Sequence, residues 1–119
     1  MPLSTPPHAS AIIVAAGRGT RMGPNVDKLF LEVAGLPVVA HTWLNFDQCD
    51  AIHDIVLVVR SGMEEAFTDL AAALKVRKPW RLAHGGAERQ DSVWNGLAAL
   101  PTATQLVAIQ DGDRKSTRL

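Results

Sequence analysis

The chain has 119 residues, of which 47% are apolar and 20% are charged, a composition typical of one folded domain and not of a disordered chain. Its 12 Lys and Arg residues balance its 12 Asp and Glu residues. The absence of an overall basic field argues against nucleic acid or an anionic membrane surface as a partner.

The sequence carries no signal for export or membrane insertion. No apolar run approaches the roughly 20 residues that span a bilayer. Residues 1–10 contain three prolines and no basic run, so we expect a disordered leader and not a signal peptide. The single Cys49 cannot form an internal disulfide. We expect it to pack as a small core residue in a protein of the reducing cytoplasm.

Apolar patterning predicts an alternation of strands and helices. The run AIIVAA at 11–16 suits a strand buried on both faces, and DIVLVVR at 54–60 is β-branched and uninterrupted. Helical or weaker strand patterns fill the rest of the chain. We expect helices at 36–46, 64–74 and 88–100, and strands at 80–83 and 105–109. This order predicts an α/β fold, a Rossmann-like three-layer α/β/α arrangement with a mostly parallel sheet.

Three segments suited to ligand binding follow predicted strands. The first is the loop VAAGRGTRMGPNVDK at 14–28, the second is Gly85-Gly86, and the third is Asp111. Ligands of parallel sheets bind at the carboxyl ends of the strands. We therefore expect the three segments to converge at one edge of the sheet.

The glycine-rich loop suits an anionic ligand, although a flexible, solvated turn is the simpler alternative. It lacks the glycine-lysine-serine/threonine step of the Walker pattern. Its glycines are spaced G-x-G-x-x-x-G, one residue longer than the dinucleotide fingerprint. The dinucleotide fingerprint also expects an acidic residue at the end of the second strand, where it binds the ribose. The second predicted strand ends at Arg60 instead, so a dinucleotide bound here would need a 2′-phosphate for the arginine to contact. The length of the loop favours one that folds over a triphosphate.

Together, three motifs resemble those of a known enzyme family. The stretch AAGRGTRMG followed by Lys28 resembles the signature of sugar and polyol-phosphate nucleotidyltransferases. The segments GGAERQDSVWNGL at 85–97 and LVAIQDG at 106–112 are similar to those of 2-C-methyl-D-erythritol 4-phosphate cytidylyltransferases. The resemblance implies a nucleotide-diphospho-sugar transferase type of fold. It also implies transfer of the cytidylyl group of CTP to a polyol phosphate, with release of pyrophosphate, in non-mevalonate isoprenoid biosynthesis.

Two other functions stay open from the sequence. Ribitol 5-phosphate cytidylyltransferases share the fold and the loops, although the segment around Ser92 favours methylerythritol phosphate. A non-catalytic nucleotide-binding domain is the alternative outside the enzyme class. Retention of Arg21, Lys28 and Asp111 together argues against it.

The resemblance also implies roles for individual residues. Arg21 and Lys28 match catalytic cations that hold the triphosphate and stabilise charge on the α-phosphate; the alternative is two surface cations. Asp111 matches an aspartate that binds Mg²⁺ through few protein ligands; the alternative is a turn former. The residues implied for CTP binding are Ala15, Ala16, Gly17, Gly19, Gly85, Gly86 and Ser92.

Within this set, Gly85 and Gly86 match the segment beside the cytosine base. Their backbone groups would form hydrogen bonds with the edge of that base. Ser92 would be a hydroxyl partner near the base, or would face solvent early in its helix. Arg89 and Asp91 fit an ion pair at the helix start. We expect structural or packing roles for His41, His53, His84, Trp43, Trp80 and Trp94.

After Gly112 the chain departs from the family pattern of alanine, arginine and proline. Residues 113–119 can be back-translated to a common sequencing-library adapter, so we predict a non-native tail. On this hypothesis residues 11–112 are the CTP-binding N-terminal part of a longer domain. The missing part would supply the acceptor pocket, a further metal carboxylate and the dimer arm. We expect a homodimeric enzyme for the intact protein, and for this incomplete chain weak nucleotide binding without activity.

Overall fold

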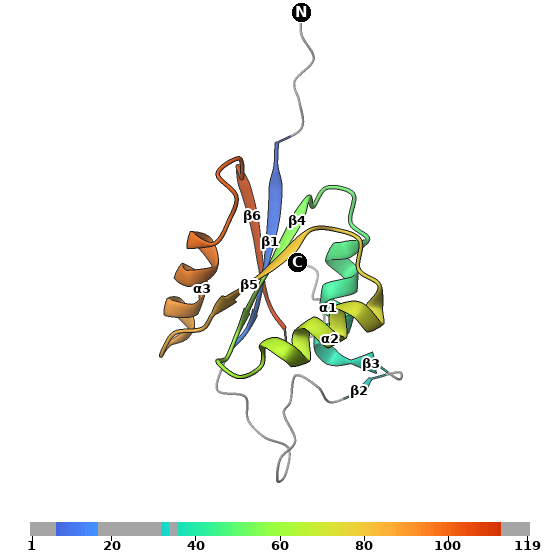
Figure 1. Ribbon diagram of the computed structural model, residues 1–119. Helices are drawn as coiled ribbons and strands as arrows, with labels where there is room; N and C mark the ends of the chain where they lie inside the picture. The colour runs from blue at the N-terminus through green and yellow to red at the C-terminus, as the bar shows by residue number, and fades with distance from the viewer. Residues whose placement is uncertain (1–6, 17–31, 34–35, 113–119) are drawn as a thin grey trace, which may run out of the picture.

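The computed structural model describes residues 7–16, 32–33 and 36–112 (Figure 1). Its main sheet is four-stranded and wholly parallel, in the order β5-β4-β1-β6. These strands are β5 (Trp80–His84), β4 (Asp54–Val59), β1 (Ala9–Ala15) and β6 (Leu106–Asp111). Numbered along the chain, the order is third, second, first, fourth, which is one half of the doubly wound arrangement.

Helices cover both faces of this sheet. In Figure 1, α1 (Val38–Asp47) and α2 (Glu64–Leu74) lie on one side and α3 (Arg89–Ala98) lies on the other. A short antiparallel pair, β2 (Glu32–Val33) and β3 (Leu36–Pro37), precedes α1. The arrangement confirms the predicted Rossmann-like α/β/α fold. No helix in the described ranges is long and apolar enough to cross a membrane.

Several element boundaries differ from the prediction. Strand β1 begins at Ala9, because the Ser10 hydroxyl bonds the Thr104 hydroxyl at 2.8 Å and lets a polar residue be buried there. The predicted leader thus overlaps a strand, while residues 1–6 lie outside the described residues. The first helix begins after Pro37 because Leu36 and Pro37 pair with the preceding strand.

The core consists of two clusters, one on each face of the sheet. All seven residues of β1 are buried, as expected for a strand covered on both sides. Ile13 packs in the cluster that contains Trp43 of α1 and Phe67 of α2. Ile12 and Val58 pack in the other cluster, against α3. Side chains from the helices therefore pack against both faces of the central strands β1 and β4.

Two side chains are more exposed than the sequence analysis predicted. Cys49 is exposed just after α1 ends, and Trp94 of α3 is 72% exposed, so the expected core and packing roles are wrong for these two. Trp94 lies on the side of α3 away from the sheet, where nothing described covers it. The packing prediction holds for Trp43, which is fully buried with its ring edge-on to Trp80 at 5.4 Å.

Helix α3 approaches the sheet through a glycine. A Cβ atom at Gly96 would lie 2.9 Å from Cγ2 of both Ile12 and Val58. Real Cβ contacts essentially never fall below 3.0 Å, so a side chain here would push the helix away from the sheet. Helix α3 begins near the carboxyl ends of the strands, so this contact also fixes how close the start of the helix lies to the sheet.

We predict that Gly96→Val lowers the free energy of unfolding by about 1–3 kcal/mol through overpacking. The matched control is Ala98→Val, an exposed position of the same helix, where valine costs less than about 1 kcal/mol of helix propensity. Urea denaturation followed by circular dichroism measures both. Equal losses for the two variants would contradict the packing argument.

Candidate nucleotide-binding site

The carboxyl edge of the parallel sheet brings together segments that lie far apart in the sequence. The register places Val14 beside Asp111, and Val59 beside both Ala15 and His84. The residues after β1 and β5 therefore meet the end of β6 at one edge, as predicted. The strand order reverses between β1 and β6, which is where ligands of doubly wound sheets bind.

A cleft of about 430 Å³ opens at this edge. Three of the residues implied for CTP binding line it, namely Ala16, Gly86 and Ser92. Ala15 is buried as the last residue of β1, directly before the cleft. Gly85 is described but is not one of the residues that line the cleft. Gly17, Gly19, Arg21 and Lys28 lie outside the described residues.

Charged side chains also line the cleft, and the sequence analysis gave them no place in this site. They are Arg60, Glu88 and Arg89. Arg60 follows β4 directly, and the sequence analysis considered it only as a contact for the 2′-phosphate of a dinucleotide. Glu88 and Arg89 lie at the start of α3, whose N-terminal dipole adds partial positive charge at the cleft. The walls therefore suit an anionic ligand.

Gly85 lets the loop after β5 touch the residue that follows β1. A Cβ atom at Gly85 would lie only 2.2 Å from Cβ of Ala16 and 3.0 Å from the Ser92 hydroxyl. Glycine is therefore required by the close approach of two loops, not by an unusual backbone dihedral angle. This contact joins two of the three converging segments.

Gly86 is also fixed by its surroundings. Its N–H donates to the Ser92 hydroxyl at 3.1 Å, and an added Cβ would lie 2.3 Å from Cβ of Asp91. Ser92 is buried at 2% exposure, so it does not face solvent in the structure. The N–H of Gly85 donates to Val59 O at 2.9 Å. Both glycine N–H groups thus have acceptors within the protein.

His84 anchors the same loop from the other side. Its Nε2 lies in hydrogen-bonding contact with Glu64 of α2, and its carbonyl accepts from Asn95 Nδ2 at 2.8 Å. The structural role expected for His84 agrees with these contacts. The Glu64 carboxylate accepts hydrogen bonds from the Glu64 backbone N–H, from the His84 ring and from the Gly62 N–H, and these lower its pKa. The loop after β5 is therefore held by contacts with α2, α3 and β4 where it borders the cleft.

Asp111 lies at the end of β6 and forms an ion pair across the edge. Arg89 Nε donates to Asp111 Oδ1 at 3.0 Å. The expected pairing of Arg89 with Asp91 is therefore wrong. Asp91 instead accepts from the Glu88 N–H at 3.2 Å, as part of a capping box that begins α3. The capping box holds Asp91 in place, and Arg89 pairs with Asp111 of β6 instead.

Asp111, at the end of β6, is the carboxylate that the sequence analysis assigned to a magnesium ion. No group of three histidine, cysteine, aspartate or glutamate side chains in the described ranges could hold a metal on its own. Mg²⁺ commonly binds through one or two carboxylates and completes its shell with water and substrate phosphates. Asp111, beside a cleft suited to an anion, fits that mode of binding.

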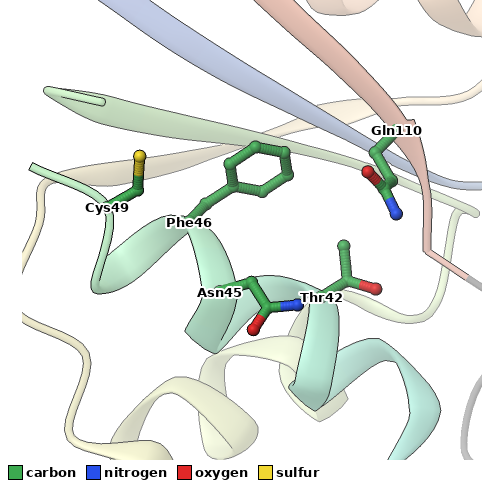
Figure 2. Close-up of a pocket in the computed structure, with 5 residues that line it drawn as sticks. All are labelled: Thr42, Asn45, Phe46, Cys49 and Gln110. Atoms are coloured by element: carbon green, nitrogen blue, oxygen red, sulfur yellow. The ribbon is translucent and has the colours of Figure 1, made fainter. Parts of the chain in front are cut away.

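A second, smaller hollow lies on the other face of the sheet, between α1 and β6. Its volume is about 140 Å³. Figure 2 shows the residues that line it, Thr42, Asn45, Phe46, Cys49 and Gln110. None of them is charged, and none belongs to the residues implied for CTP binding. The hollow shares no lining residue with the cleft at the carboxyl edge.

The parallel sheet, its helical layers and the strand order are those of an α/β domain of the nucleotidyltransferase type. A family model described as 2-C-methyl-D-erythritol 4-phosphate cytidylyltransferase (IspD) matches residues 9–118, a range that extends into the predicted tail. The chain therefore belongs to this family.

Individual relatives agree with this assignment. The chain is 43% identical over 106 residues to the 2-C-methyl-D-erythritol 4-phosphate cytidylyltransferase of Pelotomaculum thermopropionicum, covering 88% of this chain and 44% of the relative. Its identity to that of Geobacillus kaustophilus is 41% over 109 residues, covering 92% and 47%. The chain spans just under half the length of these curated relatives.

A solved structure is also similar. The crystal structure of 4-diphosphocytidyl-2C-methyl-D-erythritol synthase from Anaerococcus prevotii superimposes with a TM-score of 0.76 at 31% identity. The alignment covers 91% of this chain and 44% of that one.

We predict that Gly85→Ala destabilises the protein by about 1–3 kcal/mol, because the new methyl group overlaps that of Ala16. Adding Ala16→Gly removes the overlapping methyl group and should restore part of the loss. Thermal unfolding of both single variants and the double variant measures the coupling. A double variant no more stable than Gly85→Ala would contradict the contact.

We also predict a pH-dependent contribution from Glu64. Because its pKa is lowered in the folded state, its ionised form adds stability above the ordinary glutamate pKa, and this is lost as the pH falls through the lowered value. Glu64→Gln should therefore lower Tm at neutral pH and converge with the parent protein in acid. Glu65→Gln, exposed in the same helical turn, is the control and should show no such convergence.

Proposed function

We propose that this chain provides the CTP-binding part of a 2-C-methyl-D-erythritol 4-phosphate cytidylyltransferase. The observation that carries the proposal is a cleft at the carboxyl edge of the sheet, lined by Ala16, Gly86 and Ser92, in a chain of this family. Asp111 lies at the same edge, paired with Arg89 of the cleft lining. The names of the relatives favour methylerythritol phosphate over ribitol phosphate as the acceptor. The activity belongs to a protein of the relatives' full length, of which this chain spans less than half.

The proposed reaction is a nucleotidyl transfer. An oxygen of the acceptor phosphate forms a bond to the α-phosphorus of CTP, and the bond from that phosphorus to the bridging oxygen breaks to release pyrophosphate. Such transfers depend on alignment and on stabilisation of charge more than on covalent help from the protein. Arg21 and Lys28, by resemblance, would hold the triphosphate and stabilise charge on the α-phosphate.

The loop at Gly85-Gly86 supports a preference for cytosine. Because both N–H groups already donate within the protein, the base would be read by other atoms, such as the carbonyl oxygens. A carbonyl accepts from the exocyclic amino group of cytosine, whereas uracil presents another acceptor at that position. The loop would therefore select CTP over UTP.

Asp111 would hold Mg²⁺ together with the phosphates of the nucleotide. A bound magnesium ion supplies charge neutralisation for the phosphates. We further propose that the full-length protein acts as a homodimer in the cytoplasm.

We predict that CTP raises Tm of this chain in the presence of magnesium, and that UTP and GTP do so far less. A ligand at one hundred times its Kd stabilises a protein by about 2.7 kcal/mol. Differential scanning fluorimetry with the three nucleotides, each with magnesium or with chelator, measures the effect. Equal protection by CTP and GTP would contradict a cytidylyltransferase site.

The matched variant is Asp111→Asn, which removes the charge while keeping the shape of the side chain. We expect it to abolish the magnesium-dependent part of the protection by CTP. Asp50→Asn, an exposed position after α1, is the control and should behave as the parent protein. Unchanged magnesium dependence in Asp111→Asn would remove the aspartate from the metal site.

A further inference from the structure

We propose that Arg60 is a specificity-determining residue for the base of the nucleotide, and that it donates to N3 and O2 of cytosine and so disfavours uracil. The inference rests on the proposed function, because it takes the cleft as a CTP site. It adds to that function a side chain that distinguishes between the two pyrimidines.

The order of the strands places Arg60 on the side of the cleft where the base is expected. The sheet runs β5-β4-β1-β6, so Arg60, directly after β4, lies between the loops that follow β5 and β1. Those loops carry Gly86 and Ala16, which line the same cleft. Asp111 ends β6, two strand spacings or about 10 Å from β4. A nucleotide with its base at Gly86 and its phosphates toward Asp111 therefore brings its base to Arg60.

The side chain of Arg60 also lies on the face of the sheet that carries the cleft. Successive residues of a strand point to opposite faces. Val58 packs in the cluster against α3, and Val59 packs in the cluster against α1 and α2. The next residue, Arg60, therefore turns toward α3, whose first turn carries Ser92. Its place in the cleft lining together with Ser92 agrees with this alternation.

The other charged residues of the cleft are held at the start of α3. Glu88 takes part in the capping box, and Arg89 pairs with Asp111. Arg60 also takes part in an interaction within the protein. A guanidinium carries five N–H donors, of which the edge of a base uses two. Arg60 can therefore keep a contact with the protein and still donate to a ligand.

The difference between the two pyrimidines makes this contact selective. Cytosine presents two adjacent acceptors, N3 and O2, and the parallel N–H groups of a guanidinium match such a pair. Uracil keeps O2, but its N3 carries a hydrogen, so one N–H of Arg60 would face another donor. A donor that the base covers without offering an acceptor costs free energy. The carbonyl oxygens of the loop after β5 would select for the amino group of cytosine, whereas Arg60 selects for its unprotonated N3.

The experiment measures dissociation constants of nucleoside triphosphates for the full chain by isothermal titration calorimetry with magnesium. CTP is compared with UTP, with GTP and with the pyrimidin-2-one analogue of CTP, which lacks the amino group but keeps the N3 and O2 acceptors. The parent chain should bind the analogue about tenfold more tightly than UTP. Arg60→Met, which removes the donors and keeps an unbranched side chain, should abolish this difference.

Two further variants complete the test. Arg60→Lys keeps the charge but presents a single-point donor, which O2 of either base can accept. It should therefore not restore the tenfold difference between the analogue and UTP. Arg77→Gln removes a cation from an exposed position and should behave as the parent chain. Circular dichroism establishes that each variant is folded.

The outcomes distinguish this inference from the proposed function. If the parent chain binds CTP no better than GTP, the CTP site fails and the inference fails with it. If CTP is preferred to GTP but Arg60→Met weakens all three pyrimidine nucleotides equally, and Arg60→Lys restores them, the guanidinium contacts a phosphate and the inference is overturned. Unchanged affinities in Arg60→Met would also overturn it, while the CTP site would stand.

Discussion

The parallel pairing of β1 with both β4 and β6 is the constraint on which the rest of the structure depends. Burial of β1 on both faces fixes its register, because a shift by one residue would exchange the side chains that face the two helical layers. That register places the ends of three strands at one edge. The convergence of Ala16, the loop after β5 and Asp111 at this edge follows from that alignment.

The cleft is assembled by close packing as much as by charge. Gly85 touches Ala16, Gly86 touches Asp91, and Gly96 lets α3 lie against Ile12 and Val58. At each of these positions a methyl group would force elements apart. Bonds from Ser92, Glu64 and Asn95 then hold the loop after β5 in place. A site built in this way is ordered before a ligand arrives, which lowers the entropy lost on binding.

The sequence was sufficient to predict the layers and the edge, because long apolar strands and the parallel-sheet rule determine both. It was insufficient for contacts that depend on three-dimensional side-chain placement. Arg89 is two residues from Asp91 but bonds Asp111, since the capping box already uses Asp91. For Ser92 the sequence left a solvent-facing position open, whereas the side chain is buried and accepts from the Gly86 N–H. Ala9 and Ser10 joined a strand through a hydroxyl pair that apolar patterning cannot detect.

Strand β6 shows a further property of the chain. Within the described residues it pairs with β1 alone and forms an edge of the sheet, and Leu106, Val107 and Ile109 on it are 55%, 38% and 42% exposed. An open strand edge with apolar side chains is a template for pairing with a strand of another molecule. At high concentration this chain should therefore self-associate, and a solubilising fusion partner or a charged substitution on β6 would keep it monomeric for biophysical work.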